Sequence, residues 1–430
     1  MSLSNKSAND NIEFSSKEEI DEYQLSLLAK QLDYAKKKSP FYTKLFLKIG
    51  ATNFSDIPFT VKNDLSISND LFLAIDREDI AEICTTSGST GNQVSIYQSK
   101  NDLERLALNE YSSFQKMGIQ KKDIVQLMLT LDKQFMAGIA YYSGLLYTDA
   151  TIIRGGPANP EIQLNSLIKN QVTCLIAIPS AILKIIEYAQ EISFDLTSLP
   201  LKKILCIGET IYTKQFEFNL LSMKISQALS VELFSTYASS EMQTAFTDCS
   251  FHIGLHMNPT LLFVEVIDEQ GNQVQNREVG EVVISPLGIE GMPLLRYKTE
   301  DICEYISEAC KCGRNTIRLG PVLGRKSQML KLNGTTIFPM AINQILSADS
   351  NIADFLLIAS KDLMGLDNLM IHLKPINSDK SFVSTIEKRL QSLLRVSISI
   401  IECSETDIKL LRGNINSSKA VKFIDNRGLN

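Results

Sequence analysis

The chain has 430 residues, of which 44% are hydrophobic and 21% are charged, and its net charge is −6 at neutral pH. This length accommodates about two or three domains with a large core, and the composition excludes a disordered chain. The negative charge argues against a broad nucleic-acid or membrane surface, because both partners are anionic. Its eight cysteines are scattered, and no apolar stretch resembles a secretory signal or a membrane span, so we expect a cytoplasmic protein.

The region before Glu82 predicts helices. Apolar side chains recur there at helical spacing, at Leu25, Leu28, Leu32 and Ala35. A turn is expected at SPFY, residues 39–42, because the residue before a proline avoids the helical backbone region.

Between Glu82 and about Phe234, short apolar runs alternate with amphipathic stretches. Strands are predicted at IVQLMLT, TIIRGG, TCLIAI and KKILCI, and helices over 103–114 and 180–191. This alternation is typical of a parallel sheet covered by helices on both faces. After Tyr237, the runs LLFVEVIDEQGNQV, GEVVISP and LLRYKTEDICEYI are separated by Gly and Asn turns and predict an antiparallel region.

The C-terminal region predicts a small α+β unit, with strands FLLIA, LMIHLKP and VSISIIE around a helix over 379–394. The expected fold class is therefore α/β, with a large N-terminal domain of doubly covered sheets plus an antiparallel β region, and a small mobile α+β C-terminal domain. The segment GRKSQMLKLNG is the best boundary, and we place the domains at 1–324 and 325–430.

The stretch TTSGSTGNQV, residues 85–94, contains glycines and small hydroxyls that can surround phosphate oxygens. It is not a P-loop, because Asn92 follows Gly91 and a strand-like run comes next. Nor is it a dinucleotide fingerprint, which needs a third glycine and a helix. Taken alone, the stretch is better explained as a turn joining two strands. Whether it binds phosphate depends on the motifs elsewhere in the chain.

Seven separated regions resemble, in order, the adenylate-forming acyl-CoA ligases, and most closely their phenylacetate-CoA ligase branch. They are SPFYTKLF with IPFTVKNDL, then TTSGSTGNQV, CIGETIY, YASSEM, MPLLRYKTEDI, LGRKSQMLKLNGTTIFP and NINSSKAVKFID. The resemblance covers nearly the whole chain. Each motif is weak alone, but their order and compatible spacings are together specific.

The resemblance implies an ATP site. Its phosphate-binding residues would be Ser87, Gly88, Ser89, Thr90 and Gly91. The residues around adenine would be Gly208, Glu209 and Thr210 together with Tyr237, Ala238 and Ser239. Asp301 would accept the ribose hydroxyls, and Arg325 would donate to the ribose or the α-phosphate. Family members usually have Lys where Asn92 stands, which leaves the terminal phosphates to neutral donors and Mg²⁺.

The resemblance also assigns catalytic and acid-binding residues. Lys419 matches the family's catalytic lysine and would lie between the two anions that react, the carboxylate and the α-phosphate, with Lys422 as the alternative. Glu241 would coordinate Mg²⁺, and Ser240 would contact the α-phosphate. The acyl group would lie against Phe135 and Tyr142, for which a role as ordinary core aromatics is an equal explanation.

A second site needs no nucleotide. Cys310 and Cys312 form a C-x-C knuckle in CKCGR, and CSFHIGLH supplies Cys249 with His252 or His256. Four such ligands suit a tetrahedral structural Zn²⁺ site, and buried thiols without metal are the alternative. Because GLH stands where zinc-binding relatives of this branch place their histidine, the resemblance favours His256.

The function that the resemblance implies is a Mg²⁺- and ATP-dependent ligase for an aryl or arylalkyl carboxylic acid. It would form acyl-AMP and then a thioester of coenzyme A, and the C-terminal domain would reorient about GRKSQ between the steps. The expected partner is a small acid, with an acyl carrier protein and a homodimer as further options, but no nucleic acid and no membrane. The alternatives are transfer to a carrier-protein phosphopantetheine, an amine or a cofactor hydroxyl, a nucleotide-binding protein without turnover, and an unrelated zinc-stabilised α/β protein.

Overall fold

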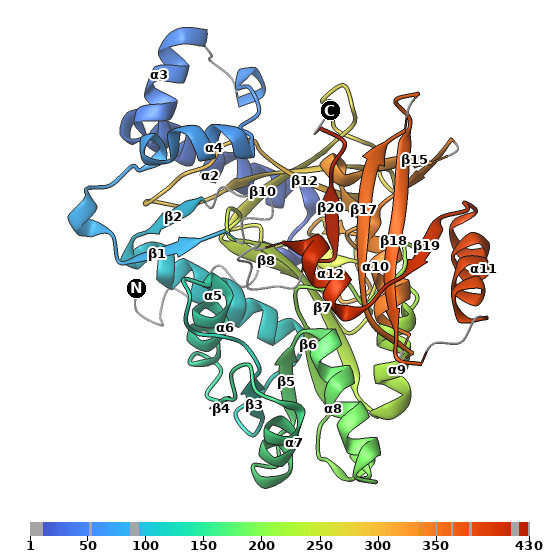
Figure 1. Ribbon diagram of the computed structural model, residues 1–430. Coiled ribbons are helices and arrows are strands. Elements are labelled where there is room, and N and C mark those ends of the chain that lie inside the picture. Colours follow the sequence, from blue (N-terminus) through green and yellow to red (C-terminus); the bar gives the residue numbers. More distant parts are fainter. Residues whose placement is uncertain are drawn as a thin grey trace. The chain divides into compact units, whose positions relative to one another are not determined.

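The computed structural model describes residues 12–50, 54–86, 94–332, 334–349, 351–362, 364–377, 381–413 and 421–428. The chain divides into two compact units. The first comprises residues up to Phe218 with 225–299 and 303–322, and the second comprises 219–224, 300–302 and the chain from Leu323 onward. Within these units, helices and strands mix as expected for the α/β class (Figure 1).

Three helices open the first unit: α2 (Lys17–Lys38), α3 (Pro40–Ile49) and α4 (Lys62–Ser68). The break predicted at SPFY is confirmed at Ser39, whose backbone is extended between α2 and α3, but residues 40–42 belong to α3 and not to a turn. Proline fits the first helical position, where its missing N–H is not needed. These helices contact residues that lie about 250 positions later in the sequence. Gln31 donates to the carbonyl of Ile289 at 2.9 Å, and the N–H of Leu295 donates to the Tyr42 hydroxyl at 2.7 Å.

A twelve-stranded sheet dominates the described chain, in the order β10-β11-β12-β13-β9-β8-β7-β6-β5-β3-β4, with β14 paired to β12. Its parallel part consists of β3 (Ile124–Leu127), β4 (Thr151–Arg154), β5 (Cys174–Ala177), β6 (Lys203–Cys206) and β7 (Glu232–Ser239). All four residues of β5 are buried, as expected for a strand covered on both faces.

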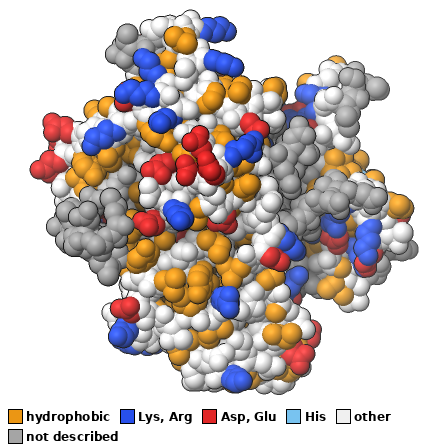
Figure 2. Space-filling model, turned by 90° about the vertical axis from the view of Figure 1, so that its left-hand side faces the viewer, with side chains coloured by type: hydrophobic (Ala, Val, Ile, Leu, Met, Phe, Trp, Pro, Cys, Tyr) orange, Lys and Arg blue, Asp and Glu red, His pale blue; other side chains and the backbone are white. Residues whose placement is uncertain are grey.

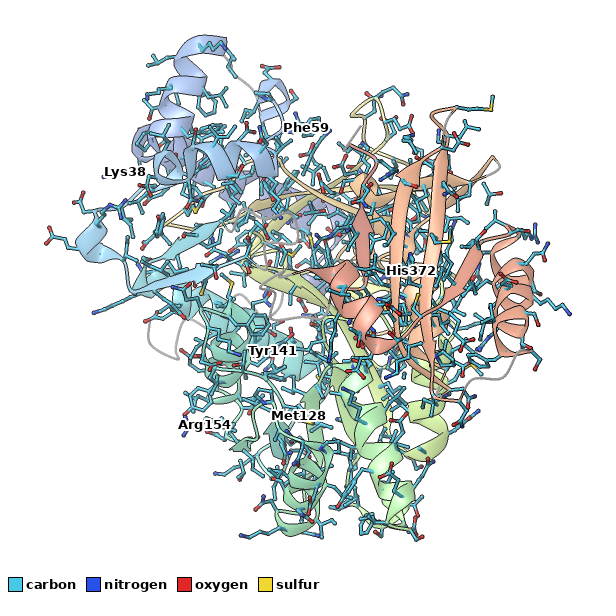
Figure 3. All side chains as sticks on the ribbon, viewed as in Figure 1. Lys38, Phe59, Met128, Tyr141, Arg154 and His372 are labelled. Atoms are coloured by element: carbon cyan, nitrogen blue, oxygen red, sulfur yellow. The ribbon has the colours of Figure 1, made fainter. Side chains whose placement is uncertain are left out.

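Helices alternate with these parallel strands along the chain. They are α5 (Lys100–Lys116), α6 (Met136–Leu145), α7 (Pro160–Lys169), α8 (Pro179–Glu191) and α9 (Leu220–Ala228). Helix α5 packs on α6, and α7 packs on α8. Phe114 of α5, Leu127 of β3 and Ile176 of β5 share one buried core with Tyr141 of α6, which is labelled in Figure 3.

The predicted antiparallel region is confirmed by the pairing of β7 with β8 and of β10 with β11. Its strands are β8 (Thr244–Thr247), β9 (Leu255–His256), β10 (Leu262–Ile267), β11 (Val279–Pro286), β12 (Tyr297–Ile306), β13 (Arg318–Leu319) and β14 (Gly324–Arg325). A separate hairpin of β1 (Glu82–Thr85) and β2 (Ser95–Gln98) precedes α5.

The second unit is a small α+β structure with its own core. Its sheets are the hairpin β15 (Leu330–Leu332) and β16 (Thr335–Ile337), and four strands in the order β19-β18-β17-β20. These four are β17 (Ile352–Lys361), β18 (Asp367–Pro375), β19 (Ser399–Glu402) and β20 (Phe423–Asp425). Its helices are α10 (Pro339–Ser347), α11 (Phe382–Leu394) and α12 (Glu405–Arg412).

Acidic and basic side chains are interspersed on the face that Figure 2 shows, as the modest net charge leads one to expect. None of the helices in the described ranges is both long and apolar enough to span a bilayer.

Candidate active site

Two of the predicted nucleotide-binding segments lie side by side at one edge of the sheet. Strands β6 and β7 are parallel, with Cys206 opposite Ser235. Gly208 follows β6 and Tyr237 lies near the end of β7, so both are at the carboxyl edge, where α/β sheets bind ligands. Gly208 has a φ of 71°, a conformation that suits glycine.

The turn after β7 is held by its own polar contacts. Tyr237 is buried and stacks on Phe246, with 5.7 Å between ring centroids. The N–H of Met242 donates to the Ser239 hydroxyl at 3.2 Å. Ser240 and Glu241 remain partly exposed, and the Glu241 carboxylate has a long contact of 3.4 Å with the Tyr297 hydroxyl. A half-exposed carboxylate on a fixed turn is suited to hold a cation.

Glu209 has a structural role that the sequence did not reveal. Its carboxylate accepts hydrogen bonds from the N–H and the hydroxyl of Ser180, at 2.9 and 2.8 Å. Ser180 lies in the first turn of α8, so Glu209 satisfies a free donor and places negative charge at the positive end of that helix. The neighbouring Thr210 hydroxyl is 3.5 Å from the carbonyl of Tyr212.

The predicted phosphate loop joins the two strands of the β1–β2 hairpin. The N–H of Thr86 donates to the carbonyl of Val94 at 2.9 Å, which closes the hairpin on both sides of the loop. Ser87, Gly88, Ser89, Thr90 and Gly91, together with Asn92, lie outside the described residues. A hydrogen bond of 3.1 Å from the Thr85 N–H to the Gln134 carbonyl brings this hairpin to the start of α6.

The two candidate acid-binding aromatics differ in position. Phe135 immediately precedes α6 and is half-buried, beside the hairpin contact made by Gln134. Tyr142 packs against the core between α5, α6 and the sheet, and the Arg154 guanidinium lies 6.0 Å from its ring. Phe135 is therefore the better placed of the two to meet a ligand at the hairpin.

In the second unit, the predicted ribose-binding residues pair directly. Asp301 of β12 is opposite Arg325 of β14, and Arg325 Nε is 3.4 Å from Asp301 Oδ1. The predicted hinge GRKSQ continues from β14 into a short 3₁₀ turn over Lys326–Gln328. At Gly324 a Cβ would lie 2.4 Å from the Phe338 ring, so only glycine fits here.

The two candidate catalytic lysines are Lys419 and Lys422. Lys419 lies outside the described residues. Lys422 Nζ is 2.7 Å from Asp354 Oδ1 and 4.2 Å from the centroid of the Phe355 ring. Lys422 is therefore engaged by a carboxylate of its own unit.

The four predicted zinc ligands converge within the first unit. The ligand atoms of Cys249, His256, Cys310 and Cys312 all lie within 4.8 Å of one another. The Cys249 and Cys310 sulfurs are 3.8 Å apart, and Cys312 Sγ is 3.5 Å from His256 Nε2. Tetrahedral bonds of about 2.3 Å to sulfur and 2.0–2.1 Å to nitrogen would separate the ligand atoms by about 3.8 and 3.5 Å. These separations fit a zinc ion.

The protonation states of His256 and Cys312 also suit metal ligands, whereas burial raises the pKa of Cys249 to about 12 and opposes its ionisation while no ion is bound. His256 Nδ1 is 2.9 Å from the Thr316 hydroxyl, which leaves Nε2 facing Cys312. Burial, assisted by the charges of Lys116 and Arg314, lowers the pKa of His256 to about 2, so the imidazole is neutral. Burial raises the pKa of Cys312, but hydrogen bonds from Arg314 outweigh it and lower that pKa below its usual value.

His252 lies outside this cluster. Its Nδ1 is 3.1 Å from Asp248 Oδ2 and its Nε2 is 3.3 Å from Glu232 Oε1, so both nitrogens are occupied. The geometry thus places His256, and not His252, among the cysteines.

Glu13 lies beside the C-x-C knuckle, a position that its sequence context does not indicate. Its buried carboxylate lies 2.5 Å from Arg314 Nε and 2.9 Å from Lys116 Nζ. Arg314 in turn points a guanidinium nitrogen at Cys312 Sγ, at 3.7 Å. Because 301 residues separate Glu13 from Arg314, no local pattern could reveal this contact.

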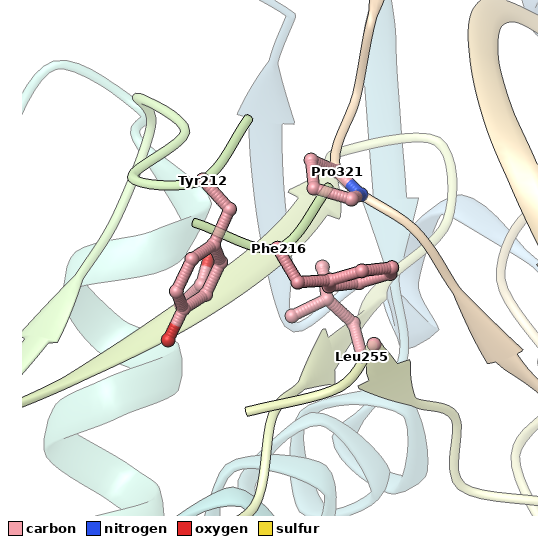
Figure 4. A pocket seen from close by; sticks show the side chains of 6 residues that line it. Tyr212, Phe216, Leu255 and Pro321 are labelled. Atoms are coloured by element: carbon pink, nitrogen blue, oxygen red, sulfur yellow. The ribbon is translucent and has the colours of Figure 1, made fainter. Parts of the chain in front are cut away.

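A small pocket adjoins β7 in the first unit (Figure 4). It is lined by Tyr212, Phe216, Ser235, Gly254, Leu255 and Pro321. The space between these side chains is too narrow to hold a nucleotide.

The profile of the AMP-binding enzyme family matches residues 19–289, more than half of the chain, and the chain therefore belongs to this family. The phenylacetate-coenzyme A ligase of Thermus thermophilus is 26% identical over 347 residues, which cover 77% of this chain and 76% of the relative. The phenylacetate-coenzyme A ligase of Escherichia coli is 23% identical over 443 residues, 98% of each chain. These similarities confirm the resemblance to the phenylacetate-CoA ligase branch.

A solved structure supports the fold assignment. The crystal structure of a 2-hydroxyisobutyryl-CoA ligase in the postadenylation state superposes with a TM-score of 0.82 at 19% identity, over 98% of this chain and 92% of that one. At this identity the likeness concerns the fold alone.

Proposed function

We propose that the protein is an ATP-dependent acid–CoA ligase that activates a carboxylic acid as acyl-AMP and then transfers the acyl group to coenzyme A. The observation that carries this proposal is the similarity over 98% of both chains to a phenylacetate-coenzyme A ligase, within the AMP-binding enzyme family. The names of the relatives favour an aryl or arylalkyl acid, and this substrate class is part of the proposal.

In the first half-reaction, the carboxylate attacks the α-phosphorus of ATP and pyrophosphate leaves. Lys419 would neutralise the two approaching anions, and Ser240 would donate to the α-phosphate. Glu241, partly exposed on its fixed turn, would hold Mg²⁺, which supplies positive charge beside the phosphates. Tyr237, Ala238 and Ser239 would border the adenine together with Gly208, Glu209 and Thr210.

In the second half-reaction, the thiolate of coenzyme A attacks the acyl carbon and AMP leaves. This step needs no cation between a carboxylate and a phosphate, so Lys419 would act in the first step only. Asp301 and Arg325 would hold the ribose, since the two carboxylate oxygens of Asp301 can accept from both hydroxyls and Arg325, 3.4 Å away, can donate beside them.

We also propose that Cys249, His256, Cys310 and Cys312 hold a structural Zn²⁺. The support is the pair of separations, 3.8 and 3.5 Å, that tetrahedral coordination requires. The ion would join two loops of the first unit and would take no part in the reaction.

The first experiment measures pyrophosphate release from Mg-ATP with a panel of aryl, arylacetic and short aliphatic acids, each with and without coenzyme A. Release with one acid, accelerated by coenzyme A and yielding a thioester, supports the proposal and names the substrate. Acid-dependent pyrophosphate release that does not change when coenzyme A is added would indicate a carrier protein or an amine as the acceptor. ATP binding without pyrophosphate release for any acid would favour a nucleotide-binding protein without turnover, the alternative that Asn92 supports.

A further inference from the structure

The short turn between β7 and β8 in the first unit carries Glu241. Ser239 is opposite Thr244 across the two strands, so residues 240–243 form the turn. The N–H of Gln243 donates to the carbonyl of Ser239 at 3.3 Å, across the base of the turn. The position of Glu241 therefore depends on what holds the end of the turn at Gln243.

Gln243 is held through both its main chain and its side chain. Arg105 of α5 donates from Nη1 to the Gln243 carbonyl at 2.8 Å. Gln98 of β2 donates from Nε2 to Gln243 Oε1 at 3.2 Å. The exposed fractions of Arg105, Gln98 and Gln243 are 6%, 0% and 1%, so water does not compete for these hydrogen bonds. Two elements that lie 138 and 145 residues earlier in the sequence thus meet at one residue of the turn.

The two partners of Gln243 are themselves fixed. Arg105 Nε donates to the carbonyl of Leu287 at 2.6 Å, and its Nη2 donates to the carbonyl of Leu261. A guanidinium is planar, so it cannot release one of these carbonyls without moving relative to the others. Gln98 Oε1 accepts from the Cys84 thiol of β1 at 3.5 Å, which orients its amide.

Gln243 also has two features that lower the stability of the fold. Its φ is 50°, in the left-handed region that residues with a Cβ disfavour. Its buried Nε2 has no hydrogen-bond partner among the described residues, and a buried donor without an acceptor is unfavourable. Backbone strain of this kind gathers at functional sites. Both features lie two residues after Glu241, which indicates that Gln243 serves this turn rather than the stability of the core.

We propose that Gln243, held by Arg105 and Gln98, is a positioning residue for Glu241 as a ligand of Mg²⁺. The inference rests on the proposed function, in which Glu241 holds the ion. Only Met242 separates the two residues, so a displacement of Gln243 moves the Glu241 carboxylate with it. Groups that orient a metal ligand typically contribute about 10- to 100-fold to metal affinity or activity. Gln243 acts through Glu241 and touches neither the ion nor the substrates.

The test measures metal binding by the full-length protein without turnover. Mn²⁺, which accepts the same oxygen ligands as Mg²⁺, is titrated in the presence of α,β-methylene-ATP, and free Mn²⁺ is followed by electron paramagnetic resonance. Gln243→Asn tolerates the left-handed backbone, but its side chain is too short to reach Gln98. The Kd for Mn²⁺ should rise by about 10- to 100-fold. Gln98→Met removes the same contact from the other side and should raise this Kd similarly, and the double variant should not add the two effects.

The matched control is Gln163→Asn, the same substitution in another buried glutamine pair. Gln126 Nε2 donates to Gln163 Oε1 at 2.7 Å, and the exposed fractions of these residues are 0% and 1%. Gln163→Asn should leave the Kd for Mn²⁺ within about twofold of wild type, because a protein that is only less stable offers fewer sites of unchanged affinity. An unchanged Kd in Gln243→Asn and Gln98→Met, or an equal rise in Gln163→Asn, would overturn the inference.

Glu241→Gln separates this inference from the proposed function. If Glu241→Gln weakens Mn²⁺ binding and Gln243→Asn does not, the metal role of Glu241 stands and only the inference is wrong. If Glu241→Gln binds Mn²⁺ as tightly as the wild type does, the proposed metal role of Glu241 fails first, and the inference fails with it.

Discussion

At the scale of single residues, Lys419 and Lys422 have different expected roles. Lys419→Ala should lower acyl-AMP formation by several orders of magnitude and still convert supplied acyl-AMP to thioester, because the positive charge is needed only where two anions meet. Lys422→Ala should cause a smaller loss, since Lys422 is engaged by the Asp354 carboxylate of its own unit. Single-turnover assays of each half-reaction measure both variants. A Lys419→Ala enzyme that loses the two steps equally would show that this lysine is misplaced.

Glu110 makes the stability of the first unit depend on pH. Burial raises the pKa of Glu110 to about 7, and its Oε2 has no hydrogen-bond partner among the described residues. Because this pKa exceeds the unfolded value, the folded state binds the extra proton, and stability falls as pH rises from about 4.5 to 7.

Glu110→Gln should therefore unfold at a higher temperature than the wild type at pH 8, and the difference should shrink at pH 5. Thermal unfolding followed by circular dichroism at both pH values measures this. Glu104→Gln, at an exposed position of the same helix, is the control and should change little. A Glu110→Gln protein that is less stable at both pH values would show that the carboxylate is charged and held in the folded state.

At the scale of elements, the proposed zinc ligands come from the loop before β9, from His256 of β9 and from the C-x-C knuckle before β13. Cys310→Ser should remove metal from the purified protein and lower its melting temperature, without a selective loss of ATP binding. Elemental analysis and thermal unfolding measure these effects. Cys174→Ser, which alters a buried thiol of β5, should keep the metal. If the purified wild-type protein contains no zinc, the proposed zinc site is wrong.

Glu209 links a helix to the edge of the candidate nucleotide site. Glu209→Ala should lower the free energy of unfolding by about 1–2 kcal/mol, the usual effect of removing an N-terminal cap, because the Ser180 N–H loses its acceptor. Denaturant unfolding and ATP titration, performed on the same variant, separate this capping role from nucleotide binding. An unchanged stability would contradict the capping role.

For the molecule as a whole, the sequence predicted the fold class and the positions along the chain of the parallel strands β3, β4, β5 and β6. The apolar runs that became β3, β5 and β6 are short and continuous, which is the pattern of strands buried on both faces. The cysteine spacing left His252 and His256 as alternatives, and the family resemblance favoured His256, the histidine that lies among the three cysteines. The nucleotide assignments at Tyr237 and Asp301 depended on motif order, and their roles remain predictions.

The sequence did not predict the contacts between residues that lie far apart in the chain. The helix that begins at Pro40 was taken for a turn, because a proline permits both and the Tyr42 contact with Leu295 that stabilises the helix lies 253 residues away. The sequence assigned Glu209 to the adenine site and did not single out Glu13, and only the folded chain brings these carboxylates to Ser180 and Arg314. No local pattern contains such information.

The docking of the first helices onto residues near 290 has a consequence for synthesis. A ribosome adds about 5–20 residues per second, so the chain that covers Tyr42 emerges roughly 12–50 s after Tyr42 itself. During that interval the nascent helices lack their partner and expose side chains, such as Phe46, that the finished protein buries. The growing chain, rather than the folded protein, is therefore the form in which these apolar side chains are open to contact with other chains.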